Sequence, residues 1–206
     1  MVVALLAAGT AVAASAEARH RGCAVPRGDA VEAKTRYAVV YVQDAEHIYG
    51  CLFSLGRRAL LFDAEDPLLL AGRYVAYEQV SYDPDSTVYY LLTVFDLRRR
   101  TAHSFSSLYE EQPPTASSRE SQDPGMATDL VLKKNGSVAW ISCWRFPPGP
   151  GGCAVDADTP AEMWRTDSRG TKLLDASTDV RLRSLKRKGS TITWRHGTER
   201  RTARLK

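Results

Sequence analysis

Acidic residues recur in the sequence where one predicted strand gives way to the next. They are Asp44, Glu46, Asp83, Asp85, Asp156, Asp158 and Glu199. Carboxylates that converge on one rim can bind Ca²⁺, which takes about six to eight oxygen ligands. The Asp-x-Asp spacing of Asp83, Asp85, Asp156 and Asp158 predicts such an acidic binding rim, although the rest of an EF-hand pattern is missing. The alternative is a set of solvated turns, because aspartate favours turns through its own backbone hydrogen bonds.

Motifs for catalysis are missing from the sequence, which contains no G-x-S-x-G, H-E-x-x-H, Walker or G-x-G-x-x-G pattern. Its histidines, His20, His47, His103 and His196, are scattered. A catalytic triad assembles in space, so the sequence singles out no catalytic residue. It favours a non-catalytic binding or scaffold module of the cell envelope, with an unidentified ligand or protein partner, no cofactor other than Ca²⁺, and a monomeric state. The alternative is a secreted hydrolase that uses rim carboxylates.

Four cysteines are spread widely along the chain, at Cys23, Cys51, Cys143 and Cys153. No close pair has the spacing that a structural zinc site needs, so a metal role is disfavoured. An even number of separated cysteines is typical of disulfides in exported proteins. Three pairings are open, and we predict Cys23–Cys51 and Cys143–Cys153, because the second pair closes a short loop.

The N-terminus resembles a secretory signal peptide. Residues 2–16 carry no charge, and the stretch is too short for a membrane-spanning helix. Small residues at 14–16 form a cleavage pattern, although no Lys or Arg precedes the apolar run. Either the true start lies upstream of Met1, or the segment is an Ala-rich tail. We predict a cleaved signal peptide over 1–16, a secreted or extracytoplasmic protein, and an N-terminal segment, 17–36, tied down by a disulfide. No later segment is apolar enough to span a bilayer.

The C-terminal segment, residues 181–206, is strongly basic, with ten Lys or Arg side chains against the single acid Glu199. Arg204 lies between Ala203 and Leu205, an alternation that places these charges on the solvent face of terminal strands. Lys and Arg discourage edge-to-edge pairing of strands. Contact with a polyanion is the second interpretation.

Composition and pattern predict an all-β fold. Hydrophobic residues make up 44% and charged residues 25% of the 206 residues, which excludes a disordered chain, a coiled coil and a multi-span membrane protein. Short β-branched and aromatic runs are separated by Gly, Pro, Asp and Ser, as in antiparallel sheets. Polar or proline-rich stretches at 110–125 and 145–160 predict loops.

A unit with a turn glycine, a strand and a terminal aromatic recurs along the chain. Its clearest copies are 72–77, 136–140 and 189–194, each preceded by an apolar stretch and followed by further strands. These copies predict one repeat domain over 37–206, an antiparallel meander of about four three-stranded units. An irregular β-barrel or sandwich is the alternative architecture. Trp140 and Trp194 hold matched positions and are predicted to lie between units, because aromatic side chains bury a large area.

Two segments of this pattern are similar to a known repeat. Residues 132–140 (LKKNGSVAW) resemble the strand motif of TolB/WD40-type β-propeller repeats, and residues 166–174 (TDSRGTKLL) resemble the D-x-x-G turn that follows it in the same blade. The mature chain also resembles uncharacterised exported proteins of high-GC bacteria that carry such repeats. The resemblance implies a propeller-like arrangement, although TolB-type propellers have six blades and this chain has about four units.

Overall fold

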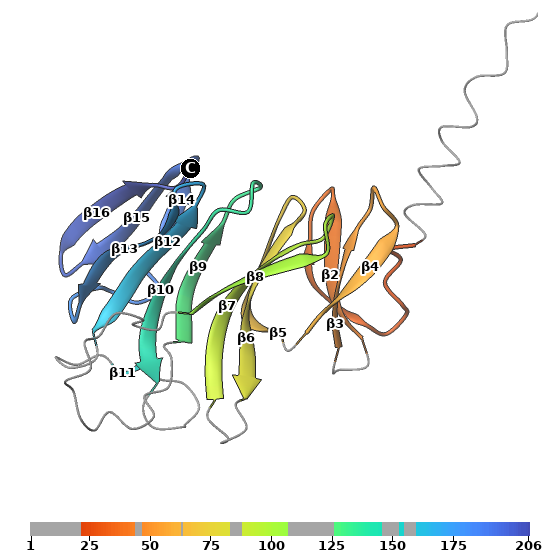
Figure 1. The fold of residues 1–206 in the computed structure, drawn as a ribbon, viewed down its shortest axis with the longest axis horizontal. Helices are drawn as coiled ribbons and strands as arrows, with labels where there is room; N and C mark the ends of the chain where they lie inside the picture. The colour runs from red at the N-terminus through yellow and green to blue at the C-terminus, as the bar shows by residue number, and fades with distance from the viewer. Residues whose placement is uncertain are drawn as a thin grey trace, which may run out of the picture.

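Every regular element in the described part of the computed structural model is a β-strand. The described residues are 22–43, 47–62, 64–82, 88–106, 126–145, 153–154 and 160–206. Their strands form four antiparallel sheets that follow one another along the chain and lie side by side (Figure 1). The prediction of an all-β meander of four units is therefore confirmed, and the sheets are separate rather than closed into the alternative barrel.

Each sheet takes its strands from one continuous stretch of sequence. Sheet 1 contains β1 (Ala30–Lys34), β2 (Ala38–Gln43), β3 (His47–Leu52) and β4 (Arg57–Leu61). Sheet 2 contains β5 (Ala64–Ala71), β6 (Tyr74–Tyr82), β7 (Val88–Asp96) and β8 (Thr101–Ser106). Sheet 3 contains β9 (Met126–Leu132), β10 (Val138–Arg145), β11 (Cys153–Ala154), β12 (Ala161–Asp167) and β13 (Gly170–Ser177). Sheet 4 contains β14 (Lys186–Lys188), β15 (Thr191–His196) and β16 (Glu199–Arg204).

The predicted size of about three strands per unit holds only for sheet 4, because sheets 1 and 2 have four strands and sheet 3 has five. In sheet 2 the strand beyond the predicted three is β5, which contains the leucine run 68–70. Leu68 and Leu70 pack against the core shared with sheet 1, whereas Leu69 packs against the core shared with sheet 3. Cores lie on both sides of the leucine run, which is therefore continuously apolar and lacks the alternation that marks a half-buried strand.

Consecutive sheets pack face to face around three apolar cores. The core between sheets 1 and 2 includes Val40, Leu61 and Tyr77, and Leu97 reaches it from the β7/β8 turn. The core between sheets 2 and 3 contains Trp140, and the core between sheets 3 and 4 contains Trp194. Both tryptophans are buried, which confirms their predicted place between units.

The first strands of the sheets lie toward a common hollow, as in a propeller. β1 contacts β5, and β5 contacts β9. The hollow has a volume of about 790 Å³, and its walls include residues 69–72 of sheet 2, 130–132 of sheet 3 and 185–187 at the start of sheet 4. Sheet 1 contributes residues 35–37, from the turn that follows β1. The first strands of sheets 1, 2 and 3 are therefore neighbours, as the inner strands of propeller blades are.

Sheet 1 stands at the N-terminal end of the row of sheets. The outer face of sheet 1 is covered by the N-terminal segment, where Cys23 and Val25 join Val39, Tyr41 and Cys51 in a small apolar cluster. A disulfide between Cys23 and Cys51 confirms the first predicted bridge. The 17–36 segment also supplies β1, so it forms part of sheet 1 as well as carrying this bridge.

The second predicted bridge and the predicted loops fall largely outside the described residues. Cys143 is buried and disulfide-bonded. The side chain of Cys153 is not among those described, so the Cys143–Cys153 pairing stays a prediction. The loop 110–125 also lies outside the described residues, as does most of 145–160, in which β11 is a described element.

Candidate functional site

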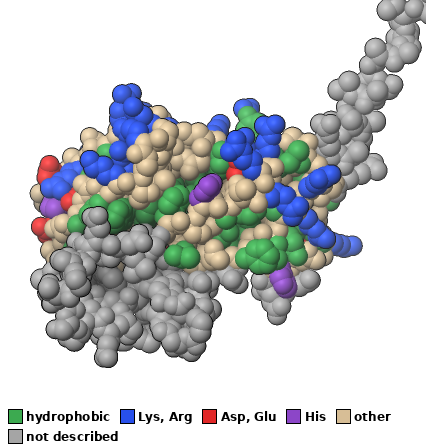
Figure 2. Space-filling model, in the orientation of Figure 1, with side chains coloured by type: hydrophobic (Ala, Val, Ile, Leu, Met, Phe, Trp, Pro, Cys, Tyr) green, Lys and Arg blue, Asp and Glu red, His purple; other side chains and the backbone are tan. Residues whose placement is uncertain are grey.

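One edge of the four sheets is formed by tight turns, and we call it the turn rim. Its turns are 35–37, 53–56, 72–73, 97–100, 133–137, 168–169 and 189–190. Two hollows are lined by several of these turns at once, which places them on the same side of the molecule. In Figure 2, Lys and Arg side chains gather along the upper edge of the molecule, where the β9/β10 turn lies in Figure 1.

Cations dominate the turn rim. Those in its turns are Arg36, Arg73, Arg98, Arg99, Arg100, Lys133, Lys134 and Arg169. The acids that border the described turns, Asp96 and Asp167, are both buried. Both carboxylates form ion pairs with arginines. The exposed side chains of this rim therefore present positive charge.

Asp96 closes the β7/β8 turn from its position at the end of β7. Its Oδ1 accepts hydrogen bonds from the backbone N–H groups of Arg98 and Arg99, at 2.9 and 3.3 Å. Its Oδ2 forms a 3.0 Å ion pair with Arg73 of the neighbouring β5/β6 turn. A carboxylate that accepts backbone N–H groups in this way fixes the turn conformation. Asp96 therefore holds two turns of sheet 2 together.

Asp167 holds the matching position at the end of β12, and its side chain has no solvent exposure. Oδ2 lies 2.5 Å from a guanidinium nitrogen of Arg165 and 2.6 Å from one of Arg169. It also accepts a hydrogen bond from the backbone N–H of Lys206 at 2.9 Å. Both arginines also donate hydrogen bonds to the backbone oxygen of Arg204. This cluster fastens sheet 3 to the last strand of sheet 4.

The Asn-Gly turn between β9 and β10 has the geometry that is typical of this residue pair in hairpins. Gly136 has a φ of 88°, in the left-handed region that glycine enters without strain. The Asn135 side-chain oxygen accepts the backbone N–H of Ser137 at 3.2 Å. The Ser137 hydroxyl donates to the backbone oxygen of Lys206. The turn therefore positions Asn135 between sheets 2 and 3.

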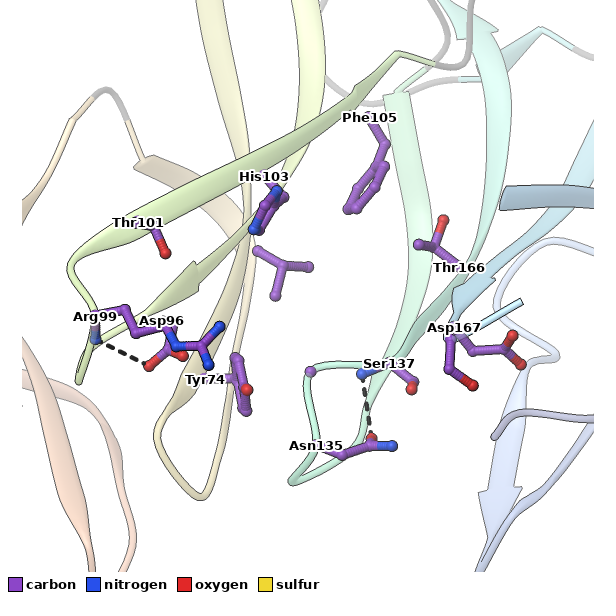
Figure 3. Close-up of a pocket in the computed structure, with 13 residues that line it drawn as sticks. Tyr74, Asp96, Arg99, Thr101, His103, Phe105, Asn135, Ser137, Thr166 and Asp167 are labelled. Carbon is purple, nitrogen blue, oxygen red and sulfur yellow. Dashed lines mark hydrogen bonds between the residues drawn. The ribbon is translucent and has the colours of Figure 1, made fainter. Parts of the chain in front are cut away.

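A pocket of about 390 Å³ opens between the turns of sheets 2 and 3 (Figure 3). Sheet 2 provides one wall, with Arg99, Thr101, His103 and Phe105 along β8 and the turn before it. Sheet 3 provides the other wall, with Asn135, Ser137, Thr166, Asp167 and Ser168. Tyr74, Val94 and Asp96 complete the lining on the sheet 2 side.

The chemistry of this pocket is that of a polar binding site with aromatic surfaces. Arg99, Thr101, His103, Asn135 and Ser168 are exposed and can form hydrogen bonds with a ligand. The half-buried rings of Phe105 and Tyr74 offer apolar surface. The carboxylates of Asp96 and Asp167 already have ion-pair and backbone partners, so the positive charge of Arg99 is left to face a ligand.

The residues predicted to form an acidic rim lie outside the described part of the chain. Asp83, Asp85, Asp156 and Asp158 fall in the segments that join β6 to β7 and β11 to β12, and the Ca²⁺ hypothesis therefore stays a prediction. Among the described residues, no group of three His, Cys, Asp or Glu side chains could hold a metal ion.

The basic C-terminal strands place most of their charges in solvent, as the alternation predicts. Exposed cations on the strands of sheet 4 are Lys186, Arg187, Lys188, Arg195, Arg200 and Arg204. Arg201 differs, because it is half-buried and forms a 2.7 Å ion pair with Asp175 of β13. The inner face of the sheet is anchored by Trp194, whose indole N–H donates to the same carboxylate at 2.7 Å. Polyanion contact through these strands stays a prediction.

No family model matches the sequence, and no curated protein matches it. Among solved structures, the crystal structure of the tricorn protease aligns with 77% of this chain at 10% sequence identity and a TM-score of 0.43. The aligned region makes up 18% of that protein chain, so this chain spans less than a fifth of its length.

One ionisable group inside sheet 3 lies away from the pocket. Burial raises the pKa of the Glu162 carboxyl, and the Trp164 indole N–H, 2.7 Å from Oε2, lowers it to a smaller extent. On the neighbouring strand, Ser142 pairs with Glu162, and its buried hydroxyl has no hydrogen-bond partner among the described residues. The charged form of Glu162 is therefore poorly solvated in the folded protein.

We expect Glu162→Gln to raise the thermal unfolding midpoint at pH 7 and to leave it nearly unchanged near pH 4. A carboxyl with a raised folded pKa stabilises the fold below its unfolded pKa, and that contribution is lost as the pH rises through the folded pKa. Glutamine stays neutral, and its oxygen can still accept the Trp164 N–H. Thermal melts across this pH range provide the measurement, with the exposed Glu199→Gln as control. A lower midpoint for Glu162→Gln at pH 7 would show that the charged form stabilises the fold.

Sequence reasoning identified the turns of the pocket but not the pocket itself. The D-x-x-G turn at Asp167 and the Asn-Gly turn at Asn135 were both visible as local motifs. Arg99, Thr101 and His103 were missed, because their importance arises from contact between turns that are far apart in sequence. A usable signal is the repetition of an aspartate before a turn, at Asp96 and again at Asp167.

Proposed function

We propose that this protein is an exported, non-catalytic binding module of the cell envelope that holds a small acidic sugar in the pocket between sheets 2 and 3. The observation that carries the proposal is the lining of that pocket, where an exposed cation and several hydrogen-bonding groups stand beside two aromatic rings. A small number of placed polar groups next to apolar walls is the usual composition of a ligand site.

The two walls match different parts of an acidic sugar. The ring of Phe105 or Tyr74 can cover the apolar C–H face of a pyranose. Thr101 and Asn135 can exchange hydrogen bonds with hydroxyl groups, because each side chain both donates and accepts. The Arg99 guanidinium pairs well with a carboxylate or a phosphate, for which its planar donors are suited. A neutral sugar would leave that charge without a partner.

Binding is favoured over hydrolysis at this pocket because both of its carboxylates have structural partners. Asp96 is held by Arg73 and two backbone N–H groups, and Asp167 by two arginines. Carboxylates that are engaged in this way hold the turns in place and are not free to contact a glycosidic bond. The hydrolase alternative depends on Asp83, Asp85, Asp156 and Asp158, which lie outside the described residues.

Export is supported by two features. Residues 1–16 have the pattern of a signal peptide, and disulfides are typical of proteins outside the cytoplasm. The Cys23–Cys51 bridge is consistent with an extracytoplasmic protein. The similarity to TolB/WD40-type repeats of exported bacterial proteins agrees with this placement, and the ligand-binding residues lie on turns of a rigid scaffold, where binding residues are common.

Titration calorimetry with glucuronate, and with glucose as the neutral comparison, tests this proposal. We expect glucuronate to bind and glucose to bind at least tenfold more weakly, because only the acid pairs with Arg99. Arg99→Gln should lower the affinity for glucuronate about tenfold, within the range for a charged hydrogen bond. Arg200→Gln, which removes the same charge from sheet 4, is the control. Equal binding of the two sugars, no binding of glucuronate, or equal effects of the two variants would refute the proposal.

A further inference from the structure

Large exposed hydrophobic side chains are concentrated on sheet 1 in the described part of the chain. They are Val31, Tyr37, Leu55 and Phe62, with exposed fractions of 50, 41, 43 and 65%. Tyr37 and Leu55 occupy the tips of neighbouring turns, β1/β2 and β3/β4, and line one hollow of about 790 Å³. Apolar side chains that gather at turn tips are unusual, because turns are ordinarily polar, and they indicate an interaction surface.

Backbone hydrogen bonds fix the two tips relative to one another. The Phe53 N–H donates to the Tyr37 carbonyl at 2.9 Å, joining the first turn to the second. Within the β3/β4 turn, the N–H groups of Leu55 and Gly56 both donate to the Leu52 carbonyl, at 3.0 and 3.1 Å. The side chains of Tyr37 and Leu55 therefore project from a rigid support rather than from a long loop.

The same hollow is surrounded by positive charge. Arg73, Arg98 and Lys134 line it, and no Asp or Glu is among the described residues of its lining. The Arg36 guanidinium carbon lies 4.6 Å from the centre of the Tyr37 ring, and that of Arg73 lies 4.9 Å from the Tyr74 ring. Arg36 can shield aromatic surface in water while keeping its charge exposed, whereas Arg73 is ion-paired with Asp96.

Apolar tips within a ring of cations match the chemistry of an anionic bilayer surface. Apolar and aromatic side chains enter the boundary between headgroups and acyl chains, and nearby Lys and Arg are attracted to negative lipids. A free polyanion would account for the cations but not for Leu55. A protein partner is less well matched, because the apolar groups stand on projecting tips and the rest of the surface is charged.

We propose that the membrane-docking surface, made of Arg36, Tyr37, Leu55, Arg98 and Lys134, binds the anionic surface of a lipid bilayer. Binding is peripheral and reversible, through one leucine and one tyrosine tip reinforced by three exposed cations, because the charge of Arg73 is paired with Asp96. The described part of the chain contains no helix suited to crossing a membrane. Tyr74 and Asn135 border both hollows, but no residue of the docking surface is among the proposed sugar-binding residues, so the two proposals are tested by different variants and either can fail without the other.

Co-sedimentation with vesicles tests this inference. We expect the protein to bind vesicles of phosphatidylcholine and phosphatidylglycerol, to bind pure phosphatidylcholine weakly, and to be released by high salt. Arg98→Gln and Lys134→Gln should each weaken binding about fivefold, the effect expected for one cation near a charged membrane. Leu55→Ser should weaken binding while leaving its salt dependence unchanged, because it removes an apolar contact and no charge.

Matched controls are available on the same chain. Phe62→Ser removes an exposed hydrophobic side chain of sheet 1 outside the docking surface, and Arg200→Gln removes a cation from sheet 4. Neither should alter vesicle binding, and thermal melts show whether each variant is folded. The inference is overturned if anionic vesicles do not bind, if neutral vesicles bind equally well, or if Phe62→Ser has the effect of Leu55→Ser. Sugar-free buffer keeps this test separate from the glucuronate titration.

Discussion

Replacing Asp167 by alanine is expected to lower the free energy of unfolding by about 3–5 kcal/mol, the cost of removing one partner from a buried ion pair. The variant leaves Arg165, whose side chain is only 10% exposed, without its carboxylate. It also removes acceptors for the backbone N–H groups of Arg169 and Lys206. Because these contacts join sheet 3 to sheet 4, the loss should weaken the attachment of sheet 4.

Urea unfolding curves measure this effect, and two variants help to interpret it. Asp179→Ala removes an exposed acid and should change the free energy of unfolding by no more than about 0.5 kcal/mol. Asp167→Asn keeps an oxygen acceptor but loses the charge, so its effect should fall between the other two. A loss for Asp167→Ala as small as that of Asp179→Ala would mean that water replaces the carboxylate.

Removing the Cys23–Cys51 bridge with the double variant Cys23→Ala/Cys51→Ala is expected to cost about 3.5 kcal/mol, by the loop-entropy estimate for cysteines 28 residues apart. The bridge holds the N-terminal segment against the outer face of sheet 1, where Cys51 is completely buried. Without it, the unfolded chain gains freedom, and the small cluster around Val25 and Tyr41 loses its covalent anchor.

Denaturant unfolding under non-oxidising conditions provides the measurement for this variant. Val25→Ala reduces apolar contact in the same cluster without breaking the cross-link, and it should cost about 1 kcal/mol or less, as expected for a half-buried valine. If the double variant costs no more than Val25→Ala, the segment is held by packing alone and the disulfide contributes little to stability.

The sheets could be predicted from the sequence because their signals are local. Alternation in β15, the Asn-Gly pair at Asn135 and the glycine at Gly170 each depend on a few neighbouring residues. The leucine run 68–70 of sheet 2 was visible as an apolar stretch but was not counted as a strand, because its side chains face cores on both sides and show no alternation. The Cys23–Cys51 pairing was predicted correctly. The short stretch between Cys143 and Cys153 favoured a bridge between those two cysteines, which left Cys23 to pair with Cys51.

The candidate site could not be predicted in the same way. The pocket brings Arg99 and His103 of sheet 2 beside Asn135 and Ser168 of sheet 3, and the packing of two sheets determines that proximity. The docking surface depends on the Tyr37 carbonyl meeting the Phe53 N–H, a contact between two turns. The acids singled out from the sequence share only a residue type and a spacing, which cannot distinguish a ligand site from solvated turns.

The row of sheets, in which the cores lie between neighbours in sequence, has a consequence for amide hydrogen exchange. In such linear arrays, stability is shared between adjacent units, and opening begins at an end. Sheets 2 and 3 have a neighbour on each side, and sheet 1 is covered by a cross-linked segment. Sheet 4 has a charged outer face with no covering element among the described residues. Its amides should therefore exchange first, through detachment of one sheet, while those of sheets 2 and 3 exchange only when the whole array opens.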